Sequence, residues 1–287
     1  MPEILQLEFM RNAILAGILA SVMCGVIGTF VVVNRIAFIS GGIAHAAYGG
    51  IGLAFFFGFS YIWGILGFSI LIAMVMAAVS LKAKQRADTI IGVLWAVGMA
   101  LGVILLDVTP GYNVDLMSYL FGSILTVPIS HIWLMLGLNA LMVAIIGYLY
   151  HDLVAISYDD EFARIRGMPV TLLYFVLIGL IALSVVMVIQ VVGLILVIAL
   201  LTIGPYIAER FSDSILKMMG YAILLNFAFT FLGLWLSYRL NLTSGASIIM
   251  VAACGFFLSF LLEWLRAKTV SLHSQGPLPE EDVSGME

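Results

Sequence analysis

The sequence Ser-Gly-Gly-Ile-Ala-His-Ala-Ala-Tyr-Gly-Gly-Ile-Gly, residues 40–52, places a single histidine among small residues within a long apolar run. If this stretch is a helix, small residues flank His45 in two adjacent rows, with Gly41 and Gly49 in its own row and Gly42 and Gly50 in the next. Small side chains let a second helix approach closely within lipid, so these glycines predict helix packing. An unpaired imidazole is unfavourable in hydrocarbon, so His45 is expected to face protein or water. It is interpreted either as a hydrogen-bonded packing residue or as a metal ligand on an ion pathway.

The composition restricts the chain to one structural class. Hydrophobic residues make up 63% of its 287 residues and charged residues only 10%, which predicts an integral membrane protein with many spans. The first apolar run is too long for the apolar core of a cleavable signal peptide, so no such signal is expected. Cys24 and Cys254 each lie within an apolar run and are expected to be buried thiols rather than a disulfide or a metal pair.

Apolar runs long enough to cross about 30 Å of hydrocarbon predict an all-helical, polytopic bundle of about nine spans. The predicted spans are residues 9–33, 36–58, 61–81, 88–107, 130–150, 170–189, 193–209, 215–237 and 246–265. The links near 34–36, 59–61 and 190–193 are very short, so the helices that they join are expected to form antiparallel hairpins. The transmembrane domain is predicted to cover residues 1–268, followed by a disordered cytoplasmic tail at 269–287.

Lys and Arg residues are enriched in the cytoplasmic loops of membrane proteins, which sets the orientation of the spans. With the basic loop at 82–88 placed in the cytoplasm, all of the 12 Lys and Arg residues except Arg11 and Arg239 fall on the cytoplasmic side. The N-terminus is then external and the C-terminus cytoplasmic. His45 lies about nine residues into the second span, which at about 1.5 Å per residue is close to the middle of the membrane.

Residues 108–129 form the longest predicted external segment. Its apolar part is too short to cross the membrane and is expected to lie at the interface or to re-enter the bundle. Asp107 and Asp115 either add functional negative charge at this external mouth or are ordinary solvated carboxylates, and the second interpretation is preferred. His131, at the outer end of the fifth span, is either a metal ligand at the external mouth or a histidine exposed to water.

The longest polar link on the cytoplasmic side joins the fifth and sixth spans. Ser157 or Asp159 is suited to cap a short helix there, Gly167 can supply its C-terminal stop, and Pro169 prevents its continuation. A short helix at about 157–168, lying along the inner face between two spans, is interpreted as a docking element for another protein. The alternative is a solvated loop helix without a partner.

Motifs of nucleotide binding and of hydrolysis are missing from the sequence. No lysine follows a glycine, so there is no P-loop, and neither Gly-x-Ser-x-Gly nor His-Glu-x-x-His occurs. The chain is therefore not expected to be an enzyme that uses one of these motifs. Any ATP hydrolysis that drives it is expected on a separate polypeptide.

Several of these features together resemble the membrane permease subunits of ABC importers for zinc, manganese or iron, over residues 11–266. The resemblance rests on the order and spacing of a few stretches. They are the histidine-bearing helix at 40–52; Tyr119-Leu120-Phe121-Gly122 on the external side; Asp160-Glu161-Phe162-Ala163 closed by Gly167; Val192-Gly193-Leu194-Ile195-Leu196-Val197 continuing to Gly204-Pro205; and Leu236-Ser237-Tyr238 followed by Ser244-Gly245.

The resemblance implies a homodimeric pore that brings two copies of His45 towards one axis, where the imidazoles and water form a weak transit site. It implies a coupling helix in which Asp160, Glu161, Ala163 and Gly167 dock on an ATP-binding subunit dimer. An extracytoplasmic metal-binding protein would deliver the divalent metal ion, and no cofactor would be bound permanently. The implied location is the cytoplasmic membrane of a prokaryote, in contact with lipid and without nucleic-acid partners.

One position departs from the family pattern. Family members often carry an aspartate one helical turn before the motif histidine, where this chain has Gly41. Carboxylate and imidazole on one helix face would offer two ligands of the kind that first-row metals use, so His45 is the one ligand expected from this helix. The alternative functions are a permease for a metal chelate or a vitamin, and an ATP-independent metal channel or carrier. The sequence does not decide which metal is moved.

Overall fold

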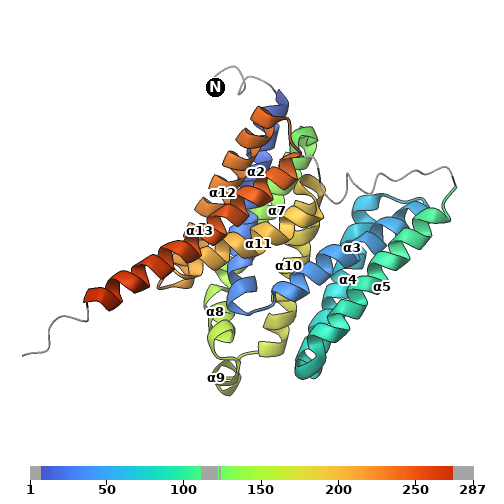
Figure 1. Ribbon diagram of the computed structural model, residues 1–287. Helices are drawn as coiled ribbons and strands as arrows, with labels where there is room; N and C mark the ends of the chain where they lie inside the picture. The colour runs from blue at the N-terminus through green and yellow to red at the C-terminus, as the bar shows by residue number, and fades with distance from the viewer. Residues whose placement is uncertain (1–7, 111–121, 123, 274–287) are drawn as a thin grey trace, which may run out of the picture.

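The computed structural model describes residues 8–110, 122 and 124–273, and the regular structure of these residues is helical (Figure 1). Among them, eight helices are long and apolar enough to cross a membrane: α2 (Glu8–Val33), α3 (Ala37–Phe57), α4 (Tyr61–Lys82), α5 (Ala87–Asp107), α7 (Ile129–Tyr148), α10 (Val170–Val192), α12 (Ile215–Leu240) and the part Ser244–Trp264 of α13 (Ser244–His273). The predicted all-helical, multi-pass fold is therefore confirmed.

The remaining predicted span is a shorter helix. α11 (Leu194–Glu209) has 16 residues and rises about 24 Å, less than the roughly 30 Å of a hydrocarbon core. It follows α10 directly because Gly193 adopts φ 81° and ψ 168°, a conformation open to glycine that ends α10. α11 also contains Pro205 and packs against α2, α12 and α13. Most of its surface is therefore buried in protein.

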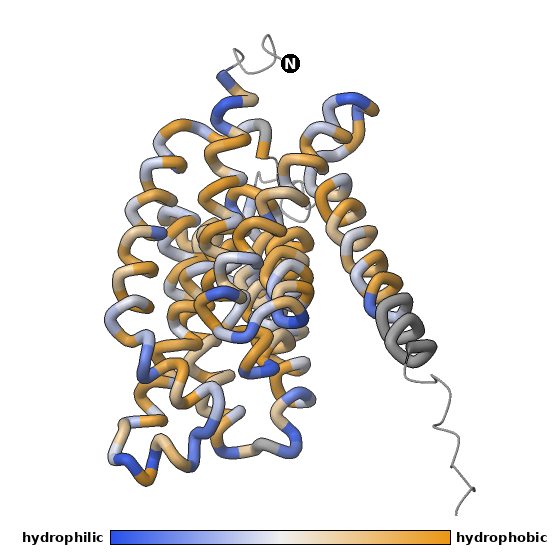
Figure 2. Tube along the Cα trace, turned by 90° about the vertical axis from the view of Figure 1, so that its left-hand side faces the viewer, coloured by the Kyte–Doolittle hydropathy of each residue, from blue (hydrophilic) through white to orange (hydrophobic). Residues whose placement is uncertain are grey.

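The helices form two groups in space (Figure 1). α3, α4 and α5 lie side by side in one group, whereas α2, α7 and α10–α13 belong to the other. α10 contacts both α3 and α4, and α11 contacts α3, so these two helices join the groups. Hydrophilic residues gather towards the ends of the bundle and hydrophobic residues along the helices between them (Figure 2), as expected for a membrane-spanning protein.

The group of α2, α7 and α10–α13 is held together by close backbone contacts and by polar side chains that donate hydrogen bonds to helix carbonyls. A Cβ atom at Gly28 of α2 would lie 2.5 Å from the backbone oxygen of Leu201 in α11, so glycine is needed for the two helices to touch. Asn226 of α12 is fully buried, and its Nδ2 donates a hydrogen bond to the oxygen of Leu200 at 2.9 Å. These contacts fix α11 between α2 and α12.

Two short helices occupy the end of the bundle opposite to the N-terminal end of α2 (Figure 1). They are α8 (Tyr150–Tyr158) and α9 (Asp160–Ile165), and they connect α7 to α10. Two 3-10 helices complete the described structure: η1 (Lys84–Arg86) links α4 with α5, and η2 (Ile124–Thr126) precedes α7.

The short links predicted after the first, second and sixth spans are present. α2 ends at Val33 and α3 begins at Ala37. Residues 58–60 form the equally short link between α3 and α4. Most of the predicted external segment, including Tyr119 and Asp115, lies outside the described residues. α13 continues through residue 269, where the tail was predicted to begin, and ends at His273. The rest of the tail also lies outside the described residues.

Candidate functional site

His45 lies near the middle of α3, and one of its ring nitrogens is already engaged. Nδ1 lies 2.9 Å from the backbone oxygen of Gly41, one turn earlier in the same helix. A carbonyl oxygen only accepts hydrogen bonds, so in the neutral ring Nδ1 carries the proton and donates it. Nε2 then holds the lone pair and is the nitrogen through which this imidazole can bind a metal ion.

The ring of His45 lies against the indole of Trp95, which α5 supplies. The two ring centroids are 4.0 Å apart and the ring planes are tilted by 32°. Trp95 also contacts the ring of Phe38, at a centroid distance of 5.9 Å, and its Nε1 donates to Sδ of Met99 at 3.2 Å. No local pattern in the sequence shows which residue of α5 faces His45, so Trp95 could not be predicted as its neighbour.

The glycines after His45 bring the backbones of α3, α4 and α5 together. A Cβ atom at Gly50 would collide with the backbone oxygen of Gly64 in α4. One at Gly52 would lie 2.5 Å from the oxygen of Gly102 in α5, and one at Gly49 would lie 2.9 Å from another carbonyl oxygen of that helix. Gly52 was not among the predicted packing positions, although its contact is one of the closest.

The glycines before His45 have looser surroundings. At Gly42 a Cβ atom would meet side-chain atoms only, Cγ2 of Ile91 at 2.9 Å and Cε of Met76 at 3.1 Å. At Gly41 the nearest atom would be Cδ1 of Ile198 in α11, at 3.8 Å, an ordinary van der Waals distance. A methyl group at residue 41 therefore fits, unlike one at the glycines further along α3.

One face of α3 is only partly covered by the rest of the described chain, where Trp95 of α5 contacts Phe38 and His45. Phe38 and Phe56 are exposed along it and His45 is partly exposed between them. Their spacing of about two and three helical turns places all three on the same side of the helix. α11 borders this face, since Ile198 lies beside Gly41. His45 therefore belongs to a surface of α3 that is open to a second molecule.

The structure does not bring the other histidines to His45. His131 stands in the first turn of α7, which is not among the helices that pack along α3. His151 lies in α8, with its ring 5.5 Å from that of Tyr150. Within the described ranges, no group of three or more His, Cys, Asp or Glu side chains is arranged to hold a metal ion. A metal site at His45 would need water or another chain to complete it.

Within the predicted docking element, α9 is closed at both ends by local hydrogen bonds. The carboxylate of Asp159 accepts a hydrogen bond from the amide of Phe162 at 2.8 Å, which is an N-cap. At the other end Gly167 has φ 80°, and the amides of Gly167 and Met168 donate to carbonyls of the last turn at 3.0 and 3.1 Å. This is a Schellman motif, so the sequence itself defines where α9 begins and ends.

α9 presents apolar side chains to solvent at the end of the bundle. Phe162 is 54% exposed and Ile165 is 84% exposed, whereas Ala163 is fully buried against the rest of the chain. Glu161 is exposed beside them and Asp160 is partly buried. Exposed apolar residues on a rigid, capped helix are typical of a surface that binds another protein.

A cavity of about 310 Å³ lies behind α9, where α2, α4, α8 and α10 come together. Asp160 lines it, and other lining residues form two hydrogen bonds with one another. Nδ2 of Asn34 donates to Oγ of Ser157 at 2.8 Å, and the hydroxyl of Tyr174 donates to Oγ of Ser80 at 3.1 Å. The α8–α9 segment is thereby connected to α2, and α10 to α4 of the other helix group.

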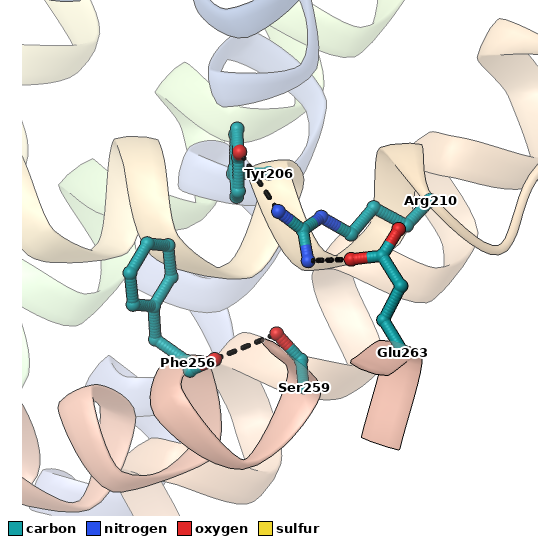
Figure 3. Close-up of polar contacts among 5 residues, drawn as sticks. All are labelled: Tyr206, Arg210, Phe256, Ser259 and Glu263. Atoms are coloured by element: carbon teal, nitrogen blue, oxygen red, sulfur yellow. Dashed lines mark hydrogen bonds and ion pairs between the residues drawn. The ribbon is translucent and has the colours of Figure 1, made fainter. Parts of the chain in front are cut away.

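The end of α11 is tied to α13 by an arginine (Figure 3). Arg210 donates to the hydroxyl of Tyr206 at 2.9 Å and forms an ion pair with Glu263 of α13. Its guanidinium carbon lies 3.9 Å from the centroid of the Phe260 ring. The side chain of Arg210 is only 18% exposed, so this cluster holds the end of α11 firmly against α13.

Comparisons with known proteins place this fold in a family. The profile described as the ABC 3 transport family matches residues 6–263. An uncharacterised membrane protein of Synechocystis sp. is 52% identical, covering 90% of this chain and 92% of the relative. The manganese transport system membrane protein MntC of Halalkalibacterium halodurans is 30% identical, covering 90% of this chain and 88% of the relative. The structure of PsaBC from Streptococcus pneumoniae in complex with Fab is similar with a TM-score of 0.81 at 28% identity, over 90% of this chain and 93% of that chain. This multi-pass membrane protein therefore belongs to the ABC 3 transport family, in agreement with the resemblance that its motifs carry.

Proposed function

We propose that this protein is the permease subunit of an ATP-driven importer that moves divalent transition-metal ions, zinc, manganese or iron, across the cytoplasmic membrane. Membership of the ABC 3 transport family supports this function, as does the relative named as a manganese transport system membrane protein. The observation that carries the proposal is the contact of 2.9 Å between Nδ1 of His45 and the carbonyl oxygen of Gly41. Because a carbonyl oxygen only accepts, Nδ1 donates to Gly41, and Nε2 is left to bind an ion on the partly covered face of α3.

A second copy of the chain completes the pathway in this proposal. One imidazole without a neighbouring carboxylate is a poor metal site, and a symmetry-related copy would supply a second imidazole. Two imidazoles and water would hold the ion weakly, which suits transport because the ion must also leave. The face that carries Phe38, His45 and Phe56 is available for this contact, since the rest of the described chain covers it only in part.

Two further partners complete the proposed importer. An extracytoplasmic binding protein delivers the ion near residues 108–131, and an ATP-binding subunit dimer docks on α9. The exposed Phe162 and Ile165 support the docking role of α9. The hydrogen bonds around the cavity behind α9 support the coupling, because one connects α8 to the residue after α2 and the other connects α10 to α4 of the other helix group.

Replacing His45 by asparagine tests the proposed ion pathway. Asparagine keeps an N–H group near the position of Nδ1 that can bond to Gly41, but it has no counterpart of Nε2. Uptake of Zn²⁺, Mn²⁺ and Fe²⁺, each measured in turn in cells that lack the native gene, should fall to background in His45→Asn and His45→Ala. The amount of folded protein in the membrane should be unchanged. His151→Asn, which alters a histidine of α8 outside the spans, is the matched control and should leave uptake intact. Normal uptake in His45→Asn would contradict the proposal.

Reversing the charge of Glu161 tests the docking of α9. Glu161→Arg leaves the caps of α9 in place and changes only an exposed side chain, so the permease should remain folded. Metal-stimulated ATP hydrolysis by the reconstituted transporter should fall at least tenfold. Asp213→Arg reverses another exposed carboxylate, between α11 and α12, and should have no effect. Unchanged stimulated hydrolysis in Glu161→Arg would remove the docking role from this helix.

A further inference from the structure

Trp95 occupies a defined place beside the imidazole of His45, and the packing of α3 on α5 sets this place. A Cβ atom at Gly98, three residues after Trp95, would lie 2.9 Å from Cα of Ala46, which follows His45. The two helix backbones therefore touch at the level of the ring pair. Their separation is fixed there by glycine rather than by flexible side chains.

The indole itself has little freedom to turn away. Its Nε1 donates to Sδ of Met99, one turn further along α5, at 3.2 Å. Its ring system also contacts Phe38, at a centroid distance of 5.9 Å and an interplanar angle of 51°. Trp95 is thus a fixed surface against which the ring of His45 lies, at a centroid distance of 4.0 Å.

This contact and the hydrogen bond to Gly41 together fix the orientation of the imidazole. Rotation about the Cβ–Cγ bond of His45 would break the bond from Nδ1 to the carbonyl oxygen and would drive the ring edge into the indole. One nitrogen is used and one ring face is covered, so Nε2 is presented in a single direction. A ligand held in one orientation binds its ion without losing side-chain freedom at that moment.

We propose that Trp95 is a positioning residue for metal transport, which holds the imidazole of His45 with Nε2 directed at the passing ion. This inference rests on the proposed function. Without the indole the imidazole would sample several rotamers, and the ion would be captured less often at low concentration. Steps that follow capture, including the movement driven by ATP, would be little changed.

Two substitutions of Trp95 separate ring contact from mere volume. In Trp95→Leu the aromatic surface is lost, and the Mn²⁺ concentration that half-saturates uptake should rise about tenfold, with the maximal rate changed less than twofold. In Trp95→Phe a flat ring remains against His45, and most of the affinity should return. Trp63→Leu is the control, because Trp63 of α4 is 70% exposed and should not affect uptake. A half-saturating concentration in Trp95→Leu equal to that of the native chain would overturn the inference.

A spectroscopic measurement leaves Trp95 in place and so does not depend on the folding of its variants. In a chain where Trp63, Trp133, Trp235 and Trp264 are replaced by Phe, the remaining indole reports on His45. Paramagnetic Co²⁺ or Mn²⁺ should quench its emission at concentrations that saturate uptake, and His45→Asn should abolish the quenching. Absence of quenching by both ions in the transporting chain would overturn the inference. Its failure is distinct from that of the proposed function: normal uptake in His45→Asn refutes the function, whereas lost uptake there with native behaviour of Trp95→Leu refutes only the role of Trp95.

Discussion

The two ends of the small-residue stretch in α3 are alike in sequence and differ in structure. At Gly50 and Gly52 an added Cβ atom would meet the backbone of a neighbouring helix, whereas at Gly41 the nearest atom would be the end of a side chain 3.8 Å away. The later glycines fix α3 on α4 and α5, and the earlier one leaves space beside His45. Glycine in a membrane helix thus marks either a backbone contact or a place with room for another group.

Replacing Gly50 by alanine should disrupt the close packing of α3 against α4. The added methyl group would collide with the backbone oxygen of Gly64, which cannot move without shifting α4. We expect Gly50→Ala to lower the free energy of unfolding by about 3 kcal/mol, measured by SDS-driven unfolding in mixed micelles. Gly67→Ala in α4 is the control, because no atom lies within 4 Å of its Cβ position. Native stability of Gly50→Ala would show that this end is not rigid.

Replacing Gly41 by aspartate should add a second metal ligand next to His45. It would place a carboxylate one turn before His45 on the same row, and the combination binds divalent metals more tightly than one imidazole. The Mn²⁺ concentration that half-saturates uptake should fall about tenfold, equivalent to about 1.4 kcal/mol, and the maximal rate should fall because the ion leaves more slowly. Gly41→Asn has the same size without the charge and should leave both parameters near native values. Identical uptake curves for the two variants would show that residue 41 does not face the ion.

The sequence predicted the features that depend on local or regional patterns. Helices follow from apolar length, and α9 could be located because Asp159 and Gly167 act within its own turns. Contacts between helices leave no such signal. Trp95 is one aromatic residue among many in apolar runs, and only the packing of α3 on α5 brings it to His45. For the same reason the sequence could not separate Gly41 from Gly50.

Alanine at Gly42 should have an intermediate effect on stability. Its Cβ atom would approach Cγ2 of Ile91 at 2.9 Å and Cε of Met76 at 3.1 Å, and only the flexible methionine can move aside easily. Alanine also favours the helix by up to about 1 kcal/mol relative to glycine. We expect Gly42→Ala to be destabilised by about 1 kcal/mol or less in the same unfolding measurement. A loss as large as that of Gly50→Ala would mean that the boundary between the two ends lies before residue 42.

Alanine at Gly41 should give the smallest effect of the series. The contact at 3.8 Å is an ordinary van der Waals distance, so the methyl group fits without displacing Ile198. The carbonyl oxygen of residue 41 remains in place to accept the hydrogen bond from His45. Removing the backbone freedom of glycine from the unfolded chain should leave stability unchanged or raise it by up to about 1 kcal/mol. Uptake of Mn²⁺ should stay at the native level, because alanine adds no ligand. If Gly41→Ala were destabilised while Gly50→Ala was not, the assignment of the two ends would have to be reversed.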